Sequence, residues 1–493
     1  MEYATDKEFD TTREALQPGK AGALESSELS GLLRKHYQNR TVPERMWEFL
    51  GGMNPESATA VYIVGNDGFS DFGQPLSPAC LPECLGAGVE IDRSLWDQDS
   101  LIADIDLEYH NFDYPAAPWL NPERSFELQQ PVLDATLSIL HQSGVAPLAL
   151  VSGRGFHLVW AVSRNSAAFR RLVGLGRVPP SLEARYAQSC SPNGLSVDPD
   201  LGRAFAGLGL IMEFVVHRVK RTSEGACTLP VQPAAIEVGP GIGGREIISF
   251  DLSEYGDPLH TRHIRLPFSA YLKPRQFQWM LGEAGVRSLL PIFTIPLFGM
   301  TPIQAIHVAR HPDEVVELSR HVSTRIPNGS IGMDKLLDEY EDSELAFFHQ
   351  QFYTHLGERP TCSMSPASTR IPGAPPCVEW LLEHPNDWLL KPAAIQHVVR
   401  VLTALDWTPA SISRQICASY HRDADWGDFW VRLDPCNRAV FYTRLFSGMI
   451  ATGTDKLIDL NCVSHKEKGY CMIPDCGSNL VQFRNTLLER RQL

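Results

Sequence analysis

Apolar positions along the chain follow two periods. Residues 101–107, 147–151 and 156–162 are short apolar runs rich in residues that favour strands, and a glycine-containing turn joins the last two. Residues 131–141 instead carry leucines at positions i, i+4 and i+7, which fall on one face of a helix. This part of the chain is therefore predicted to combine strands and helices.

The second half of the chain divides into two parts. Further strands are expected at residues 246–252 and 263–270, and residues 276–350 have mainly helical spacing. Residues 362–376 are rich in Ser, Thr, Pro and Gly, which is typical of a linker. Beyond it, helical spacing that begins at residues 393–405 predicts a C-terminal domain built mainly from helices.

Composition indicates a folded protein with more than one domain. The chain has 493 residues, of which 43% are hydrophobic and 21% charged, so two or three domains with buried cores are expected. The polar, acidic start of the chain has no apolar segment typical of a signal peptide. No run approaches the roughly 18 apolar residues that cross a membrane. We expect a cytoplasmic protein that does not enter a membrane.

Charge and cysteine content restrict the function classes. The formal net charge of −14 argues against nonspecific wrapping of nucleic acid, because such binding depends on many Lys and Arg side chains that neutralise phosphates. Any contact with nucleic acid is expected to be local. The 11 cysteines, in a chain without an export signal, indicate metal binding or free thiols rather than a disulfide framework.

Two acids, Asp104 and Asp106, interrupt the first apolar run. Alternate residues of a strand project from the same face, so one divalent cation can bridge both carboxylates. Their neighbours are apolar, and burying two carboxylates without a counter-ion costs on the order of several kcal/mol. A cation is the natural compensation, although a strand that leans towards solvent accounts for the same residues.

A glycine turn with the sequence Ser-Gly-Arg-Gly-Phe-His occupies residues 152–157. Its glycines let backbone N–H groups approach a phosphate, and Ser152 and His157 add donors to the same anion. The alternative is a surface turn with an ordinary hydrogen-bonded histidine.

A third acid, Asp251, follows another apolar run and precedes a basic segment. Arg262, Arg265 and Lys273 in that segment suit phosphate oxygens. Taken alone, Asp251 is equally explained as a strand-terminal acid, and the basic residues as a solvated strand face. Together with the other two motifs, they predict a metal-dependent nucleotidyl transfer site.

The order of these motifs resembles that of the archaeo-eukaryotic primase superfamily. A double acid, a glycine-turn histidine and a single acid precede Arg-Leu-Pro-x-Ser at residues 265–269, and the resemblance covers residues 96–275. It implies an α+β catalytic core, a mixed sheet with flanking helices, in which Asp104, Asp106 and Asp251 are catalytic and hold Mg²⁺ or Mn²⁺. The residues that it implies for nucleotide binding are Ser152, Arg154, His157, Arg262, Arg265, Ser269 and Lys273.

The chain departs from this family at one position. Where many members carry a histidine two positions after the serine of Arg-Leu-Pro-x-Ser, this chain has Tyr271. A tyrosine can donate one hydrogen bond but cannot carry a positive charge near neutral pH. The family's contact at this position is therefore not expected to be the same here.

Cysteines near the C-terminus form a second candidate site. Four thiolates can close a tetrahedral zinc site or hold an iron-sulfur cluster. The four candidates are Cys377, Cys462, Cys471 and Cys476. Their arrangement around a helical segment resembles the iron-sulfur domain of primase large subunits over residues 377–477. Cys417 lies inside an expected helix and is interpreted as a core thiol, and Cys436 is the substitute ligand if the quartet is wrong.

These observations predict five segments. Residues 1–95 have no assigned role, residues 96–275 form the primase-polymerase core, and residues 276–360 form a helical connector. Residues 361–376 are the linker. Residues 377–493 are a mainly helical cysteine-cluster domain that resembles the C-terminal domain of primase large subunits.

The expected function is that of a DNA primase or primase-polymerase, a nucleotidyltransferase that makes and extends short primers from NTPs or dNTPs on a single-stranded DNA template. The sequence has no G-x-x-x-x-G-K-[ST] motif, so unwinding is expected to come from a separate helicase or a replication or repair partner. The candidate residues for binding the 5′-triphosphate of the primer are Arg400, His421, Arg422, Arg438 and Arg444.

Two alternatives remain open at this point. One is a non-catalytic nucleic-acid-binding module that retains a primase-like core, which the acidic net charge slightly favours. The other is a different phosphoryl-transfer enzyme, such as an end-joining polymerase or a nuclease, that uses the same acids.

Overall fold

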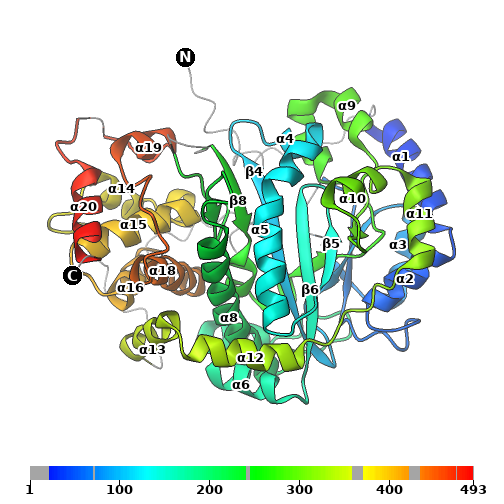
Figure 1. Ribbon diagram of the computed structural model, residues 1–493, viewed down its shortest axis with the longest axis horizontal. Coiled ribbons are helices and arrows are strands. Elements are labelled where there is room, and N and C mark those ends of the chain that lie inside the picture. Colours follow the sequence, from blue (N-terminus) through cyan, green and yellow to red (C-terminus); the bar gives the residue numbers. More distant parts are fainter. Residues whose placement is uncertain are drawn as a thin grey trace.

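The computed structural model describes residues 22–69, 73–239, 245–357, 370–420, 434–473 and 475–491. It contains strands and helices in one half and mainly helices in the C-terminal region, so the expected α+β class with a helical C-terminal region is confirmed (Figure 1). Among the residues described, no helix is both long and apolar enough to span a membrane.

The larger sheet has six strands in the order β10-β5-β6-β4-β8-β7. They are β4 (Ser100–Asn111), β5 (Leu148–Val151), β6 (Gly155–Ser163), β7 (Val231–Gln232), β8 (Glu246–Phe250) and β10 (Ile295–Pro296). Neighbouring strands are antiparallel except β7 and β8, which are parallel, so the sheet is mixed. The three expected strands at 101–107, 147–151 and 156–162 are therefore confirmed as β4, β5 and β6.

A smaller antiparallel sheet has four strands in the order β2-β1-β3-β9. They are β1 (Ile63–Asn66), β2 (Pro75–Leu76), β3 (Glu90–Ser94) and β9 (His263–Arg265). Three of these strands come from the first 95 residues, so that region completes a sheet with the segment that follows Asp251. Strand β9 is shorter than expected because Pro267 lacks an N–H and Phe268 has a φ of 68°.

Long helices lie against the larger sheet. Helices α5 (Pro122–Gln142) and α8 (Pro199–Ser223) both contact β4 and lie in front of the sheet in Figure 1. The Asp198 side chain caps α8 by accepting the N–H of Asp200 at 2.8 Å. The remaining helices before residue 270 are α1 (Gly22–Tyr37), α2 (Thr41–Phe49), α3 (Leu81–Ala87), α4 (Ala117–Leu120), α6 (Ala167–Leu175) and α7 (Pro180–Tyr186).

The connector is mainly helical, as its spacing predicts. Its helices are α9 (Gln278–Leu289), α10 (Pro302–Val308), α11 (Pro312–His321), α12 (Ser330–Glu341) and α13 (Glu344–Leu356). Much of the expected linker at 361–376 falls outside the described residues.

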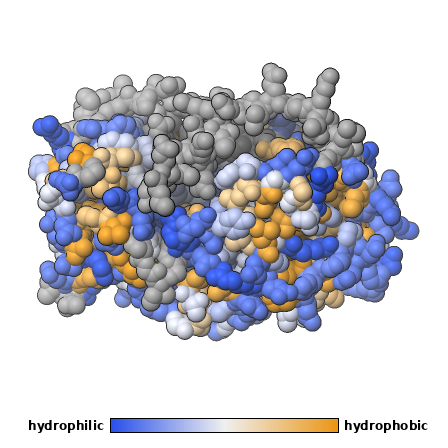
Figure 2. Space-filling view, turned by 90° about the horizontal axis from the view of Figure 1, so that it is seen from above, coloured by the Kyte–Doolittle hydropathy of each residue, from blue (hydrophilic) through white to orange (hydrophobic). Residues whose placement is uncertain are grey.

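On the face shown in Figure 2, hydrophobic residues of the described chain form separate patches among hydrophilic ones.

The C-terminal region is a group of packed helices. They are α14 (Pro376–Glu383), α15 (Pro392–Ala404), α16 (Pro409–Tyr420), α18 (Pro435–Ala451), α19 (Cys462–Glu467) and α20 (Leu480–Arg490). Helix α18 also packs against the core, where the Asn437 side chain donates a hydrogen bond to the Gly256 carbonyl. Glu213 of α8 lies 3.0 Å from His349 of α13 and 2.8 Å from Arg444 of α18, so one buried ionic group joins three parts of the chain.

Candidate metal and nucleotide site

The two acids of the first motif lie on one face of β4, as the strand period predicts. Asp104 is buried, and Asp106 is partly buried. Glu108 and His110 continue the same row of alternate residues. The sequence analysis missed these two residues, although the same alternation that identified Asp104 and Asp106 also selects them.

His157 stands directly beside this row. Strand β6 pairs with β4 so that His157 is opposite Asp106, and its Nδ1 lies 3.0 Å from Asp104 Oδ2. Burial lowers the pKa of His157, but the neighbouring charges of Asp104 and Asp106 outweigh burial and raise the pKa to about 9. His157 is therefore a cation at neutral pH, placed at the acids by strand register.

Asp251 reaches the same place from the other side of β4. Its backbone N–H donates to the Asp106 carbonyl at 3.0 Å, which continues the β4–β8 ladder by one residue. Asp251 then caps the short 3-10 helix η2 (Leu252–Gly256), because its Oδ1 accepts the N–H of Ser253 at 3.1 Å. The structure thus brings Asp104, Asp106 and Asp251 together, although they are far apart in sequence.

Two carboxylate oxygens in this cluster lack hydrogen-bond partners among the described residues. Oδ1 of Asp104 and Oδ1 of Asp106 are buried without a hydrogen-bond partner among the described residues. Burial, together with the charges of Glu108, Asp104 and Asp251, raises the pKa of Asp106 to about 8. Unpartnered buried carboxylate oxygens are ligands that Mg²⁺ and Mn²⁺ prefer, so these acids are candidates for a divalent cation site. Among the described residues, however, they do not form a group of three whose ligand atoms all lie within 4.8 Å of one another.

The predicted nucleotide-binding cations surround the acids, but most are already paired. Arg154 forms an ion pair with Glu108, and Nε of Arg154 lies 2.8 Å from Oε1. Burial raises the pKa of Glu108, but the charges of Arg154 and Lys273 overcome burial and lower it. The charge of Lys273 thus acts on the acid of this pair.

The two arginines of the basic segment are likewise held by acids. Arg262 pairs with Asp257, and Arg265 pairs with Glu90 on β3. Charge-assisted pairs fix the guanidinium groups in place before any ligand arrives.

The smaller sheet contributes a second acid pair, which the sequence analysis missed. Glu90 and Asp92 are alternate residues of β3, and Asp92 Oδ2 lies 2.9 Å from Nδ1 of His263. Burial raises the pKa of Asp92, but His263, Arg265 and His157 lower it below its ordinary value. His157 of the larger sheet is thus among the charges that act on this pair. The signal available in the sequence for this site was the pair of alternate acids, Glu90 and Asp92, in a run typical of a strand.

Ser152 and Ser269 are buried, and the hydroxyl of each forms a hydrogen bond with a backbone group. The Ser152 hydroxyl donates to the Gly155 carbonyl at 3.2 Å, and the Ser269 hydroxyl accepts the N–H of Ile91 at 2.7 Å. Their roles in nucleotide binding stay predictions. Tyr271 is also buried, with its ring 4.5 Å from the Arg265 guanidinium, and a Cβ added at Gly153 would lie 2.4 Å from two of its ring carbons.

A second candidate site lies in the C-terminal helices. Cys377, His397 and His465 each place a ligand atom within 4.8 Å of the others. Cys377 Sγ is 3.4 Å from His397 Nε2, and Nε2 of His465 is buried without a hydrogen-bond partner among the described residues. Burial lowers the pKa of His465 to about 3, so its imidazole is neutral and its nitrogen can bind a metal. This buried group can hold a metal ion.

The structure does not bring the predicted thiol quartet into this group, whose members within 4.8 Å of one another are Cys377, His397 and His465 among the described residues. Burial and the charges of Cys476, Cys471 and Cys462 together raise the pKa of Cys377 to about 12. The two histidines are the ligand candidates that sequence reasoning missed. For His465 a signal was present, because it follows Cys462 by three residues and shares a face of α19 with it.

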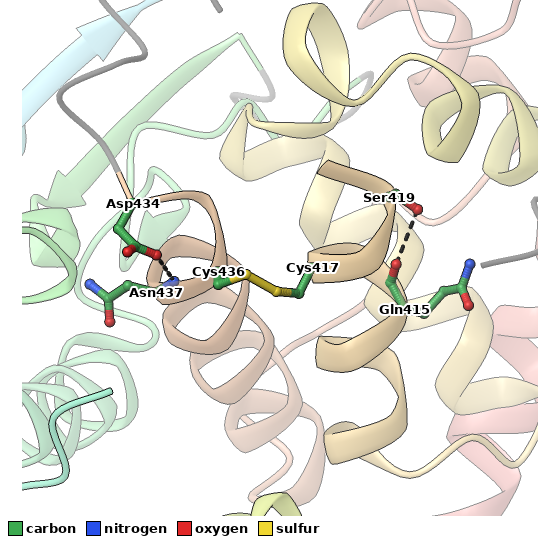
Figure 3. Close-up of a disulfide and its surroundings, with 6 residues drawn as sticks. All are labelled: Gln415, Cys417, Ser419, Asp434, Cys436 and Asn437. Atoms are coloured by element: carbon green, nitrogen blue, oxygen red, sulfur yellow. Dashed lines mark hydrogen bonds between the residues drawn. A yellow bond between two sulfur atoms is a disulfide. The ribbon is translucent and has the colours of Figure 1, made fainter. Parts of the chain in front are cut away.

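Two other cysteines are paired with each other. Cys417 of α16 and Cys436 of α18 form a disulfide with a Cα–Cα distance of 4.9 Å (Figure 3). The expected placement of Cys417 in a helix of the core is confirmed, but its sulfur is bonded and is not a free thiol. The expectation that Cys436 is a substitute ligand is wrong, because its sulfur is in the same bond. The two helices pack side by side, which brings together residues that the sequence separates by 19 positions.

Two of the residues expected to hold the 5′-triphosphate of the primer, Arg400 and Arg444, are buried in ion pairs. Arg400 contacts Asp455 at 2.8 Å and Asp459 at 3.0 Å. Arg444 contacts Glu213 at 2.8 Å. Neither guanidinium is exposed for a phosphate in this structure.

The other three residues expected to hold this triphosphate are Arg438, His421 and Arg422. Nε of Arg438 donates to the Leu390 carbonyl at 2.9 Å. His421 and Arg422 lie outside the described residues. A role for these three residues in holding a primer stays a prediction.

A cavity of about 250 Å³ lies apart from the acids, where the core meets the C-terminal helices. Aromatic side chains line it, among them Tyr186, Phe205, Tyr255 and Phe441. Tyr255 connects the cavity wall to the acid site, because its hydroxyl donates to the Asp104 carbonyl at 2.6 Å.

The fold and the sites define an α+β protein with a carboxylate cluster on its larger sheet and, in its helical C-terminal region, a buried Cys-His-His group that could hold a metal ion. Comparisons of the chain with models of known families, with curated proteins and with solved structures find no match. Function must therefore be argued from the sites.

Proposed function

We propose that this chain is a primase-polymerase with an archaeo-eukaryotic primase-like core. It makes short primers and extends them on single-stranded DNA by two-metal-ion nucleotidyl transfer. The observation that carries the proposal is the convergence of Asp104 and Asp106 of β4 with Asp251 at the end of β8, where Oδ1 of Asp104 and Oδ1 of Asp106 are buried without a hydrogen-bond partner among the described residues.

Asp104, Asp106 and Asp251 would hold two Mg²⁺ or Mn²⁺ ions. When bound, such ions activate the 3′-hydroxyl of the primer and stabilise the leaving pyrophosphate. The three carboxylates come from β4 and from the end of β8, which are hydrogen-bonded to each other. Ligands on neighbouring strands keep a defined separation, which supports a fixed geometry for the reaction.

The chain's own cations support binding of a triphosphate. His157 carries a positive charge at neutral pH and stands at the acids, and the charge of Lys273 acts on Glu108 of the Arg154–Glu108 pair. Positive groups held in place by acids need little reorganisation when a charged substrate arrives. We assign His157 and Lys273 to the incoming NTP or dNTP.

The C-terminal metal centre would help to start the primer. Its metal is either an iron-sulfur cluster on Cys377, Cys462, Cys471 and Cys476, or Zn²⁺ on Cys377 with His397 and His465. Absorption at about 400 nm and iron and zinc analysis of the purified chain distinguish the two. The helicase or other replication partner would be a separate protein.

The test is an unprimed assay on single-stranded DNA with labelled NTPs or dNTPs and Mg²⁺ or Mn²⁺. Wild type is compared with the double variant Asp104→Asn/Asp106→Asn and with Glu283→Gln, which changes an exposed acid of α9. We expect short products from wild type and from Glu283→Gln, and a loss of at least a thousandfold in the double variant, because the cation ligands are removed.

Other outcomes select the alternatives. Extension of a supplied primer without unprimed synthesis would indicate a polymerase and reject the initiating role of the C-terminal domain. Degradation of the template would indicate a nuclease. Binding of DNA without any acid-dependent reaction would indicate a non-catalytic module.

A further inference from the structure

Two aromatic side chains that take no part in the acid site are widely exposed to solvent. Phe69 lies three residues after the end of β1 and is 54% exposed. Trp279 lies in the first turn of α9 and is 62% exposed. Exposed rings of this kind are faces on which a nucleobase can stack.

Phe69 contacts the segment that leads directly into Trp279. The Arg275 guanidinium lies 4.0 Å from the centre of the Phe69 ring, and its Nη1 donates to the Asp67 carbonyl at 2.6 Å. Arg275 belongs to the short 3-10 helix η4 (Lys273–Phe277), and α9 begins at the residue that follows this helix. Phe69, Arg275 and Trp279 are called the aromatic ledge below.

The turn that carries Phe69 is held in place before any ligand binds. The Phe69 N–H donates to Asp67 Oδ1 at 3.0 Å, and the Gly68 N–H donates to Asn66 Oδ1 at 2.8 Å. Gly68 has a φ of 86°, and a Cβ at this position would lie 2.5 Å from Cβ of Leu272, so glycine permits the close packing of this turn against the residue before η4. A ring on a fixed backbone loses little conformational entropy when it binds a ligand.

The same segment is attached to the charged groups of the candidate nucleotide site. The Leu272 N–H donates to Glu90 Oε2 at 2.5 Å, and Glu90 also pairs with Arg265. The ring of Tyr271, the preceding residue, lies 4.5 Å from that guanidinium. Lys273, the following residue, is the lysine that we assign to the incoming nucleotide. The ledge therefore adjoins the nucleotide site through a short, fixed stretch of backbone.

The ledge also carries a cation that no acid of the described chain neutralises. Arg154, Arg262 and Arg265 each form an ion pair with a carboxylate. Arg275 forms no such pair with a described acid, and its contacts above are to a carbonyl oxygen and an aromatic ring. A guanidinium that is not held by a carboxylate can bind a phosphate. In a chain with a net charge of −14, a contact with nucleic acid is expected to be local in this way.

We infer that the aromatic ledge binds single-stranded DNA, with bases stacked on Phe69 and Trp279 and a backbone phosphate at Arg275. The inference rests on the proposed function, because the single strand is the template of the proposed reaction. Stacking on a side chain requires bases that are not stacked in a duplex, so the ledge selects single strands over duplex DNA.

The experiment measures the Kd of the full chain for a fluorescently labelled single strand and for the matching duplex by anisotropy, without added Mg²⁺ or Mn²⁺. The proteins are wild type, Phe69→Ala/Trp279→Ala and Arg275→Gln. We expect the double aromatic variant to bind the single strand at least roughly tenfold more weakly, because two stacking faces are removed. Arg275→Gln should weaken binding and reduce the slope of log Kd against log salt concentration by about 0.7, because one phosphate contact is lost.

Matched controls remove the same side chains elsewhere on the surface. Phe347→Ala removes a ring of α13 that is 64% exposed, and Arg170→Gln removes an exposed cation of α6. Both controls should bind the single strand as wild type does. Phe69→Tyr/Trp279→Phe keeps two rings that can stack and should also bind nearly as tightly as wild type. If this variant loses as much affinity as Phe69→Ala/Trp279→Ala, the inference is overturned.

The remaining outcomes separate the ledge from the proposed function. Wild-type affinity in Phe69→Ala/Trp279→Ala, or equal losses for single strand and duplex, would overturn the ledge and leave the acid site untouched. The variant Asp104→Asn/Asp106→Asn should bind the single strand as wild type does while it makes no primer. If wild type makes no primer either, but the ledge variants lose single-strand affinity, the proposed function fails and the ledge stands.

Discussion

At the residue scale, the acid site is a consequence of strand alternation. Every second residue of β4 from Asp104 to His110 is ionisable, whereas Ala103, Ile105 and Leu107 are buried apolar residues. Like charges in such a row repel each other, and His157 and Arg154 offset part of that repulsion through direct contacts. The remainder is what a divalent cation would neutralise.

Tyr271 allows a prediction at this scale. Its hydroxyl is buried without a hydrogen-bond partner among the described residues, while its ring packs against Arg265 and Gly153. We expect Tyr271→Phe to keep the ring contacts and to change the free energy of unfolding by 0 to about 1 kcal/mol in the stabilising direction, because an unsatisfied hydroxyl is removed. Urea unfolding checks this, and a loss above about 1 kcal/mol would show that the hydroxyl has a partner.

At the element scale, the site depends on the close pairing of β4 and β6. Their register sets His157 opposite Asp106 and Gly155 opposite Glu108. A shift of one residue would turn His157 to the other face of the sheet. Glycine at the start of β6 permits this approach, because a Cβ at Gly155 would lie 2.0 Å from the Leu107 carbonyl oxygen.

The variant Gly155→Ala tests that pairing. We expect a loss of about 3 kcal/mol or more in unfolding free energy, because the clash is with backbone and cannot be relieved by a side-chain rotation. Gly174→Ala in α6 is the matched control. A Cβ there meets no atom within 4 Å, so this variant should stabilise the helix by roughly 0.5–1 kcal/mol. Equal stabilities for the two variants would contradict the register.

The Cys417–Cys436 disulfide also belongs to this scale, because it ties α16 to α18 (Figure 3). A bridge across 19 positions should add about 3 kcal/mol by restricting the unfolded chain. We expect Cys417→Ser/Cys436→Ser to lower the unfolding free energy by that amount and to make it insensitive to dithiothreitol. Thiol counting before and after reduction verifies the bridge, and an unchanged count would show that it is absent.

At the scale of the whole molecule, the C-terminal helices are packed onto the core by buried polar contacts. Glu213, His349 and Arg444 join α8, α13 and α18, and Asn437 reaches η2. The helix that carries Asn437 therefore supports the turn that begins at Asp251. Substitutions in the C-terminal helices are therefore expected to alter the geometry of the acid site.

Glu213→Gln tests the buried contact between α8 and α18. It leaves the buried Arg444 guanidinium without its counter-charge, so we expect a loss of about 3–5 kcal/mol in unfolding free energy. Glu344→Gln is the control, because Glu344 and Arg221 form an exposed pair at 3.9 Å that should contribute less than about 1 kcal/mol. Similar losses in both variants would contradict a special role for the buried group.

Buried histidines predict how stability depends on pH. Burial lowers the pKa of His36 and His260 to about 4 and that of His217 to about 3, from 6.5 in the unfolded chain. Between these values and 6.5 the unfolded state binds more protons at these three positions, so the stability that they contribute is complete above pH 6.5 and falls on acidification. Each histidine contributes a slope of about 1.4 kcal/mol per pH unit.

Urea unfolding at pH 7 and pH 5 measures this slope. We expect the wild-type protein to be markedly less stable at pH 5. His217→Asn should reduce the difference between the two pH values, because one proton fewer is taken up on unfolding. An unchanged difference would show that His217 is protonated in the folded protein.

The fold and the sites were predictable to different extents. The strands that carry Asp104 and His157 and the helix at 393–405 follow from local apolar spacing, and the structure contains them as β4, β6 and α15. The smaller sheet did not follow, because its strands are short and β9 is far in sequence from the other three. His397 was not predicted, because a histidine among apolar residues of a helix gives no sign of what lies beside it.

The sequence by itself determined the alternation that sets Asp104 and Asp106 on one strand face, because a strand's period depends only on neighbouring residues. It also identified Cys377 as a ligand candidate. Only the tertiary structure decided that Asp251 reaches those acids, that Cys417 pairs with Cys436, and that the C-terminal helices brace the acid site. Such contacts join distant segments, and they depend on how strands pair and helices pack rather than on any local pattern.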